Sequence, residues 1–463
     1  MKKRRILAML LSCTFIASCM AGCGKQETVS DGKVTISVGN WPNAEADPEG
    51  YAREMEKLEK FNKLYPNIEV ITDEWSYDVK TFVAKAEGGT LPTLYTAHFT
   101  EADKIKKFGY ACDITDYMKK HEVSDKINEY IMDSISYEGN IYLIPFSIYS
   151  LGIVMNLDLF EQAGLIAEDG TPDVPETFAE LAETAKIIKE KTGKPGFVLP
   201  TTQNAGGWIF TSLAWNFGTK FMEQGADGKW KATFNSPECE AALQYVKDLR
   251  WKYDVLPSNT LVSNADVQKF VGSSQAAMAI AAPDVVNSLI KSYQLDKELI
   301  GFAKMPAGEN GRISLMGGGF YAIEPNATEE QVDACFKWME FNGVTPKLTE
   351  ENKQTLREDM ESDKENGILI GIKDISLWNG KAEVQAYRDS LIEEYRNVNP
   401  NHIKSYNDQS GVEYQAEEPV CAQELYSLLD GCVQEVLINE NADCKQLLEK
   451  AASDFQQNFL DYE

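Results

Sequence analysis

Short apolar runs alternate with amphipathic helical stretches after the first thirty residues of this 463-residue chain, and that alternation constrains the fold most. Val34–Val38 has the length of a buried strand, and so has Ile68–Thr72. Between them, Met55, Leu58 and Phe61 recur every three residues among Glu and Lys, which predicts a helix with one apolar face. A helix between two such strands is typical of a crossover between parallel strands. The pattern therefore predicts an α/β fold.

The same alternation continues through the middle of the chain. Predicted strands lie at 140–144, 150–155, 276–281 and 320–323, and predicted helices at 79–86, 177–191, 239–253 and 332–341. From residue 350 to the end the pattern is mainly helical, and no internal repeat is visible. At roughly 150 residues per domain, this length permits two to three domains.

The first residues have the order of a secretion signal. Lys2–Arg5 is positively charged, Ile6–Ser18 is apolar but too short to span a bilayer, and Ala21-Gly22 places small residues before Cys23. Small residues directly before a cysteine resemble the bacterial lipobox, in which the cysteine thiol is acylated. We therefore predict a lipoprotein signal peptide at 1–22, a flexible tether at 23–32, and attachment to the cell membrane on its extracytoplasmic side through lipid on Cys23.

Charge and motif content exclude several functions. With 72 acidic against 45 basic residues, a formal net charge of −27, the chain repels phosphate backbones, so we expect no nucleic-acid partner. The cysteines beyond Cys23 show no C-x-x-C pair, and His121-Glu122 lacks the second His of a zinc-protease helix. The Gly317–Gly319 triplet is not followed by the Lys and Ser or Thr of a phosphate loop. We therefore predict no metal and no cofactor.

An enzymatic reading has little support in the sequence. A glycosidase needs two carboxylates in one cleft, and Glu74 and Asp284 are candidates for such a pair. In so acidic a chain, such a pair arises easily by chance, and a bound sugar also uses carboxylates as hydrogen-bond acceptors. No Gly-x-Ser-x-Gly nucleophile motif is present. We expect a protein that binds its ligand without changing it.

Six segments, in order along the chain, resemble the family 1 extracellular solute-binding proteins, the group that contains maltose-binding protein. They are EKLEKFNKLYPNIEV, AEGGTLPTLYTAH, YEGNIYLIPFSIYSLGIVMNLDLFEQAGL, FVGSSQAAMAIAAPDVV, MPAGENGRISLMGGGFYAI and AQELYSLLDGCVQEVLINENADCKQLLEKA. One such segment alone would be weak support, but the ordered set is specific. Together the segments extend over nearly the whole chain after the signal.

The resemblance implies a periplasmic-binding-protein-like fold: two α/β lobes with mixed sheets, joined by a hinge of several chain crossings. Lobe 1 would contain 33–146 plus 284–342, and lobe 2 would contain 147–283 plus 343–463, with C-terminal helices packed on both. Ligand would bind in the cleft between them, and hinge closure would signal occupancy.

A neutral sugar presents ring faces that suit aromatic side chains and hydroxyls that suit polar ones. The candidate ligand-binding residues follow predicted strands or resemble contact positions of the family: Trp41, Glu74, Trp75, Tyr77, His98, Tyr149, Trp208, Asp284, Gly318, Phe320, Trp378 and Tyr426. For Trp41, Trp75 and Trp378, the alternative is packing within a loop.

The resemblance implies the substrate-binding lipoprotein of an ABC importer. Its expected partners are an oligosaccharide and the permease subunits, and we expect a monomer. Two alternatives stay open: a glycan-sensing receptor domain, or a binder of a phosphorylated polyol or other small anion. An anion would require Lys or Arg in the cleft, and Lys80 and Arg312 are the nearest candidates.

Overall fold

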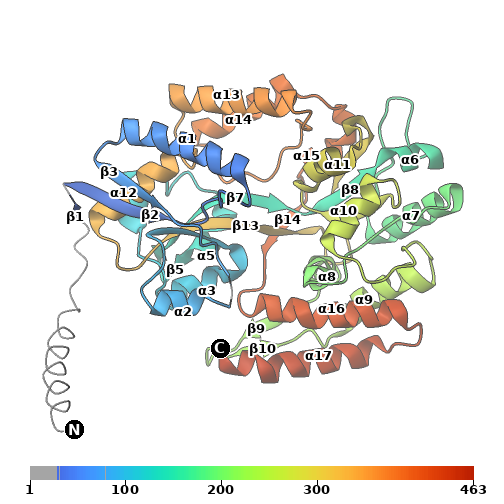
Figure 1. Cartoon of the computed structure of the whole chain (residues 1–463). Helices are drawn as coiled ribbons and strands as arrows, with labels where there is room; N and C mark the ends of the chain where they lie inside the picture. The colour runs from blue at the N-terminus through green and yellow to red at the C-terminus, as the bar shows by residue number, and fades with distance from the viewer. Residues whose placement is uncertain (1–28, 31, 79) are drawn as a thin grey trace, which may run out of the picture.

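A computed structural model describes residues 29–463 except 31 and 79. The predicted signal peptide and Cys23 lie outside the described residues, as does most of the predicted tether. Among the described helices, none combines the length and the apolar character that a membrane crossing requires. Figure 1 shows two α/β lobes side by side, joined at the centre by long strands, so the predicted fold class is confirmed.

Lobe 1 is built on a seven-stranded mixed sheet. Its strands are β1 (Val29–Ser30), β2 (Lys33–Val38), β3 (Ile68–Thr72), β4 (Leu94–His98), β7 (Leu143–Ser150), β13 (Ile313–Ile323) and β14 (Glu413–Ala416). β2 runs parallel to β3 and β4, as the sequence predicts, whereas β13 is antiparallel to β4 and β7. A small hairpin, β5 (Ser136–Tyr137) and β6 (Asn140–Ile141), lies beside this sheet.

Short helices cover both faces of that sheet (Figure 1). They are α1 (Pro48–Leu64), α2 (Phe82–Glu87), η1 (Phe99–Glu101), α3 (Ala102–Lys107), α4 (Thr115–Lys120), α5 (Glu129–Ile135) and α12 (Glu329–Phe341). α1 begins where the Asp47 side chain accepts a hydrogen bond from the Gly50 amide, and Leu58 and Phe61 are its buried apolar residues. The three-residue spacing thus places one face of α1 in the core, as predicted.

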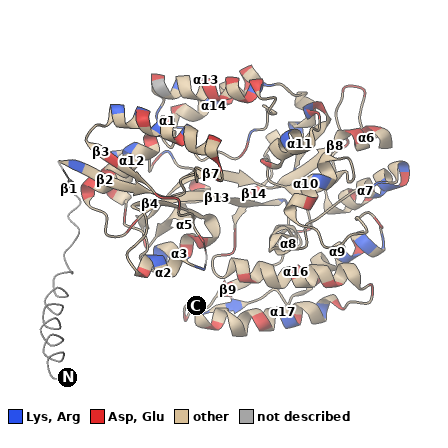
Figure 2. Ribbon diagram, viewed as in Figure 1, with Lys and Arg blue, Asp and Glu red and all other residues tan. Residues whose placement is uncertain are grey.

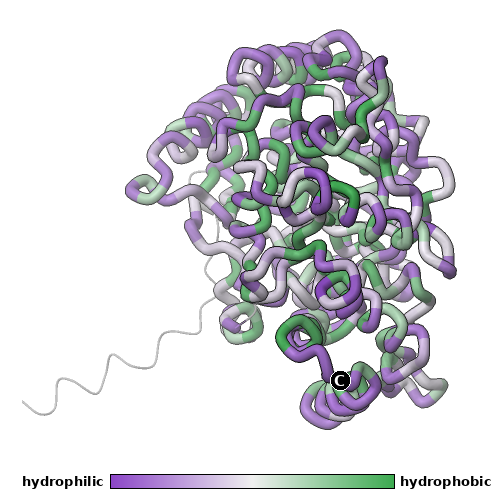
Figure 3. Tube along the Cα trace, turned by 90° about the vertical axis from the view of Figure 1, so that its right-hand side faces the viewer, coloured by the Kyte–Doolittle hydropathy of each residue, from purple (hydrophilic) through white to green (hydrophobic). Residues whose placement is uncertain are grey.

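Lobe 2 is built on three antiparallel strands: β8 (Gly152–Asn156), β11 (Met278–Ala281) and β12 (Ile300–Lys304). Its elements otherwise are α6 (Leu157–Ala163), α7 (Phe178–Thr192), α8 (Ala205–Trp215), β9 (Met222–Gln224), β10 (Trp230–Ala232), α9 (Pro237–Trp251), α10 (Asn264–Gly272), α11 (Val285–Tyr293), η2 (Lys297–Leu299), η3 (Pro400–His402), α15 (Lys404–Asn407), α16 (Ala422–Ile438), α17 (Cys444–Asn458) and η4 (Leu460–Tyr462). Buried apolar side chains form separate clusters in the two lobes, and the apolar stretches of the trace run through the interior in Figure 3.

The strand that leads out of lobe 1 is longer than the sequence predicts. Pro145 was expected to end it, yet β7 continues through Pro145 to Ser150. The register between β7 and β13 shifts at this point, with Pro145 opposite Phe320 and Ser147 opposite Gly319. A bulge tolerates a residue without an N–H, which fits Pro145 beside this register shift.

The chain returns to lobe 1 later than the predicted boundary at 284. α11 packs on α10, and β12 pairs with β8, so residues 284–304 complete lobe 2. β12 is apolar and buried at four of its five positions, and only the free edge of β8 offers it a partner there. The chain leaves lobe 2 with β13, which begins beside β14 and ends beside β4.

The segment after residue 342 is shared between the lobes. α13 (Glu350–Glu365) and α14 (Glu383–Tyr395) lie above lobe 1 next to α1 in Figure 1, and Ile375 and Trp378 join its core. Tyr406 of α15 packs on Phe302 of lobe 2, with ring centroids 4.7 Å apart. α15, α16 and α17 therefore pack on lobe 2, whereas α13 and α14 pack on lobe 1, which differs from the predicted assignment of all of 343–463 to lobe 2. Figure 2 shows the many charged residues of α13 on the outer surface.

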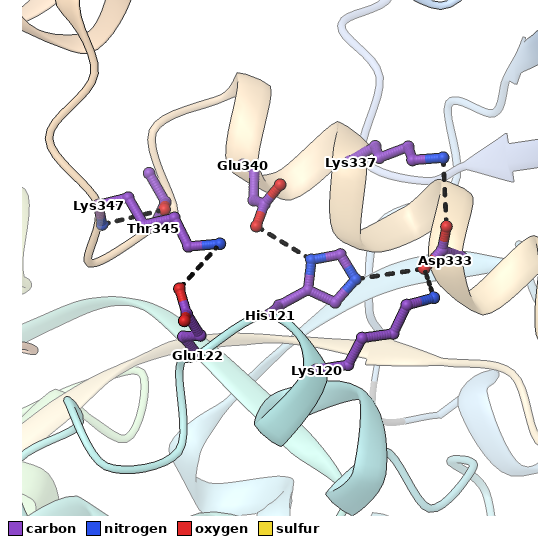
Figure 4. Close-up of polar contacts among 8 residues, drawn as sticks. All are labelled: Lys120, His121, Glu122, Asp333, Lys337, Glu340, Thr345 and Lys347. Carbon is purple, nitrogen blue, oxygen red and sulfur yellow. Dashed lines mark hydrogen bonds and ion pairs between the residues drawn. The ribbon is translucent and has the colours of Figure 1, made fainter.

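A histidine between two carboxylates fastens α4 to α12 (Figure 4). His121 Nδ1 lies 3.0 Å from Glu340 and Nε2 lies 3.3 Å from Asp333, and its ring stacks on Phe336 at 4.6 Å. Lys337 pairs with the same Asp333 at 3.2 Å. Within the described residues no group of three or more His, Cys, Asp or Glu could hold a metal, so these contacts join two helices.

α8 and α16 approach each other closely because α8 begins with glycines. A Cβ built on Gly207 would lie 2.2 Å from the Tyr426 carbonyl oxygen, and the Gly207 amide donates to Asp430 at 2.7 Å. Neither backbone can move away while that hydrogen bond holds. This packing places Trp208 and Tyr426 beside each other.

We predict that Gly207→Ala lowers the free energy of unfolding by about 1–3 kcal/mol, because the new methyl group would meet backbone. Gly431→Ala in α16 is the matched control, since a Cβ there would meet nothing within 4 Å. It should stabilise the protein by about 0.5–1 kcal/mol through helix propensity. Urea unfolding followed by circular dichroism measures both changes, and equal destabilisation by the two variants would contradict the explanation.

Candidate functional site

The crossing strands β7 and β13 form the floor between the lobes, and neither carries a charged residue. The glycine triplet makes room there for aromatic rings of β7. A Cβ on Gly317 would lie 2.5 Å from the Tyr149 hydroxyl, and one on Gly319 would lie 2.6 Å from the Phe146 ring. At Gly318 a Cβ would meet the Ser147 carbonyl at 2.2 Å. The protein's own atoms therefore fill the space beside Gly318, which is one of the predicted ligand-binding residues.

Tyr149 is half-buried where β7 leaves lobe 1, and the charges of carboxylates from distant parts of the chain act on its hydroxyl. Burial and the negative charges of Glu417, Asp284 and Asp374 raise the pKa of its hydroxyl. Asp284 begins α11 in lobe 2, Asp374 lies between α13 and α14, and Glu417 follows β14. The charge of Asp284 therefore acts on Tyr149, and the placement of both residues in a ligand cleft stays a prediction of the resemblance.

The region around Tyr149, Asp284, Asp374 and Glu417 is called the recess, and the pKa values of two of its carboxyl groups are raised. The Asp284 side chain is exposed, yet the protein around it displaces bulk water and raises its pKa. Burial raises the pKa of Asp374 to about 6, although it accepts hydrogen bonds from the Ser150 and Ile375 amides and from the Tyr406 hydroxyl.

Two tryptophans of α8 bind two adjacent carboxylates. Glu417 accepts hydrogen bonds from the Tyr426 hydroxyl at 3.1 Å and from Trp208, and Glu418 accepts one from Trp215 Nε1 at 3.1 Å. Burial raises the pKa of each carboxyl to about 7. Trp208 is half-buried, whereas Tyr426 is only 1% exposed. Tyr426 therefore positions Glu417 and leaves Trp208 as the accessible ring.

A cavity of about 370 Å³ lies on the other side of this segment, between the end of α8, β9 and β14. Glu418 and Trp215 line it, together with Thr219, Asn310 and Gln415. None of the residues that we predicted for the ligand lines this cavity. Because successive side chains of an extended segment point to opposite sides, Glu418 faces this cavity and Glu417 faces the recess at Trp208.

The ends of β3 and β4 supply the lobe 1 side of the recess. Tyr77 donates a short hydrogen bond to Glu101, and its ring lies 6.3 Å from that of His98. Lys104 pairs with Glu101 at 2.8 Å, and the charge of Glu101 acts on the pKa of Glu417 across the lobes. Tyr77 and His98 thus lie beside Glu101 in lobe 1, and their contact with a ligand stays a prediction.

Two further predicted residues lie at the outer part of this surface. Trp75 is half-buried between Tyr77 and Tyr95, with Lys85 Nζ 5.4 Å from its ring centroid. Glu74 is exposed and accepts a hydrogen bond from Asn43 at 2.7 Å.

Three predicted residues lie in the core of lobe 1. Trp41 is 5% exposed and packs 6.0 Å from the Trp338 ring. Phe320 is fully buried against Phe99, and Trp378 is 5% exposed in the segment that pairs with Ile127. These rings fill the space between the sheet and its helices, so none of them can serve as an open sugar platform.

Sequence reasoning missed the three carboxylates Glu101, Asp374 and Glu417. They lie far apart in the chain, and an acidic residue carries no signal in a sequence with 72 of them. The spacing of the tryptophans in α8 is a sequence signal for this part of the site. Trp208 and Trp215 are seven residues apart and therefore share one face of a helix. Their carboxylate partners could not be read from that spacing.

Comparisons with known proteins agree with this geometry. The sequence model of a family described as bacterial extracellular solute-binding protein matches residues 45–344. A polygalacturonan/rhamnogalacturonan-binding protein of Bacillus subtilis is 24% identical over 302 residues, which cover 61% of this chain and 57% of the relative. The chain thus spans about half the length of the curated relatives that it matches.

Two solved structures show the same fold. A cyclic alpha-maltosyl-1,6-maltose binding protein of Arthrobacter globiformis has a TM-score of 0.64 at 20% identity, covering 91% of this chain and 98% of that chain. A Mycobacterium tuberculosis protein in complex with glycerophosphocholine has a TM-score of 0.67 at 17% identity, covering 92% and 98%.

The raised pKa of Glu418 predicts a pH dependence of stability. In the unfolded chain the pKa of Glu is about 4.3, so folding favours the protonated form. The stabilising contribution of Glu418 is complete below about pH 4.3 and is lost as the pH rises through about 7. In Glu418→Gln the side-chain oxygen can still accept from Trp215, and the fall in unfolding free energy between pH 5 and pH 8 should shrink by about 1–3 kcal/mol.

Denaturant titrations at the two pH values measure this difference. Glu440→Gln is the control, because Glu440 is exposed. An unchanged pH dependence in Glu418→Gln would show that Glu418 is ionised in the folded protein.

Proposed function

Because this chain belongs to the family of bacterial extracellular solute-binding proteins, we propose that it is the substrate-binding component of an ABC importer and captures an oligosaccharide between its lobes. The observation that carries the proposal is the recess at Tyr149, where side chains of both lobes meet over the crossing strands. The Bacillus relative is named for binding pectic polysaccharides, and the Arthrobacter protein for binding a cyclic maltose derivative.

The chemistry of the recess suits a polyhydroxylated ring. Trp208 and Tyr149 are half-buried and offer apolar faces, and the carboxylates at Glu417 and Asp284 accept hydrogen bonds from hydroxyls. These groups bind and orient a ligand. We infer that the protein returns it chemically unchanged, as a carrier does.

Closure of the lobes would bring further side chains together. Lys107 of α3 already lies 5.8 Å from the ring centroid of Trp230 in β10, a contact between the lobes. We propose that ligand bound at Tyr149 and Trp208 stabilises this closed arrangement, which the permease subunits then recognise. We propose also that lipid on Cys23 holds the protein, as a monomer, at the extracytoplasmic side of the cell membrane.

Arg312, one of the two cations considered for an anion-binding site, already has a carboxylate partner. The Arg312 guanidinium donates to Glu176 at 2.6 Å, so it is already neutralised. Lys80 is exposed on the segment before α2. A phosphorylated ligand at Tyr149 would instead face several carboxylates.

We predict that Trp208→Ala weakens binding of the best oligosaccharide by about 10- to 100-fold, because the ring is the accessible platform of lobe 2. The oligosaccharide is found first as the one that raises the melting temperature most in a panel of glycans. Isothermal titration calorimetry then measures the affinity, and urea unfolding should be nearly unchanged.

Trp41→Ala is the matched control. Trp41 is buried against Trp338, so its removal should lower the free energy of unfolding by about 3–5 kcal/mol. The affinity of the folded fraction should be preserved. A loss of affinity in Trp41→Ala but not in Trp208→Ala would contradict this assignment of the recess.

A further inference from the structure

The cavity between the end of α8, β9 and β14 has the size and depth of a small-molecule site. Its volume of about 370 Å³ lies within the range of about 300–1,000 Å³ that is typical of ligand pockets. Its lining includes exposed residues, among them Lys220 and Asn310, and also Trp215 and Glu418, which are only 1% and 7% exposed. The cavity therefore leads from the surface to a buried carboxyl group.

The walls of this cavity are fixed by hydrogen bonds of the protein itself. Asn216 is fully buried at the end of α8, and its side chain accepts from the Ile313 amide at 2.7 Å and donates to the Ile313 carbonyl at 2.9 Å. The Asn310 amide donates to the Asn216 carbonyl at 3.0 Å. Gly218 makes the turn from α8 towards β9 with a φ of +96°, which favours glycine. Because the walls are held in place, a ligand would bind with little reorganisation of the site.

Polar side chains of the lining have hydrogen-bonding capacity left for a ligand. Glu418 accepts one hydrogen bond, from Trp215 Nε1 at 3.1 Å, so most of the roughly four acceptor positions of its carboxyl group stay open. Within the described part of the chain, the Gln415 side chain makes no hydrogen bond, and that of Asn310 makes one, to the Trp215 carbonyl at 3.2 Å. The cavity thus offers two amides and a carboxyl group to a polar molecule.

The charges of the lining favour a neutral ligand. Lys220 is already paired with Glu223 at 3.2 Å, so an anion would instead meet the carboxylates of Glu413 and Glu418. Burial raises the pKa of Glu418 to about 7, so this carboxyl group is largely protonated near neutral pH and attracts a cation only weakly. Amides and a protonated carboxyl group both donate and accept, which matches hydroxyl groups.

We propose that this cavity is a second binding site, separate from the recess, and that it takes one neutral monosaccharide or a polyol of similar size. Gln415 and Asn310 bind the hydroxyls that lie towards the surface, and Glu418 binds a hydroxyl at the buried end. Trp215 and Phe221 supply apolar surface beside them. This site goes beyond the proposed function, because its residues take no part in the recess.

Calorimetry on the full chain at pH 7 tests the proposal with glucose, galactose and xylose, and with glucuronate as the charged counterpart. At least one neutral sugar should bind with a Kd of about 0.1–1 mM, and glucuronate should bind about tenfold more weakly. Gln415→Leu and Asn310→Ala should each weaken the neutral sugar about tenfold, because each removes a hydrogen-bonding amide. Gln446→Leu, on the exposed side of α17, is the matched control and should leave the affinity unchanged.

Trp208→Ala separates this cavity from the recess, because it should leave the affinity for the monosaccharide unchanged. Urea unfolding of each variant shows that a weakened affinity is not a loss of folded protein. Absence of binding by all three neutral sugars up to about 10 mM would overturn the proposal. So would binding that Trp208→Ala abolishes while Gln415→Leu and Asn310→Ala preserve it, and so would glucuronate binding as tightly as the neutral sugars. The oligosaccharide measurements on Trp208→Ala judge the proposed function independently.

Discussion

The pairing of β7 with β13 is the interaction on which the rest of the molecule depends. These strands are hydrogen-bonded to each other from Leu143 to Ser150, and they lead from the sheet of lobe 1 towards lobe 2. Both lack charged side chains, and the glycine triplet of β13 lets rings of β7 lie on the strand. The floor between the lobes is therefore apolar and aromatic, and charge reaches it only from neighbouring segments.

Those segments are positioned by helix packing rather than by the sheet. Close contact of Gly207 with the Tyr426 backbone sets α8 against α16, and this contact brings Trp208 and Tyr426 to the same carboxylate. Glu417 and Glu418 follow β14 directly, with one residue towards the recess and the next towards the cavity behind it. The site is thus built where a crossing strand ends against a helix pair.

The carboxyl groups near Tyr149 and Trp215 have raised pKa values. Burial raises the pKa of Glu417 and Glu418 to about 7 and that of Asp374 to about 6, because the surrounding protein stabilises their neutral forms. These groups lie in the range where modest changes in surroundings alter their ionisation.

The sequence by itself determined the elements and the family. The spacing of Met55, Leu58 and Phe61 predicted α1, the helical pattern over 177–191 predicted α7, and the ordered motifs indicated two α/β lobes. These features depend only on residues that are close together in the sequence, so they can be recognised without the tertiary structure. Tertiary structure alone decided that β12 pairs with β8, that Trp41, Phe320 and Trp378 are core, and that Glu417, Asp284 and Asp374 meet at Tyr149. An aromatic ring after a strand suits a core and a binding site equally well, and carboxylates from separate segments of the chain come near one another only through the tertiary fold.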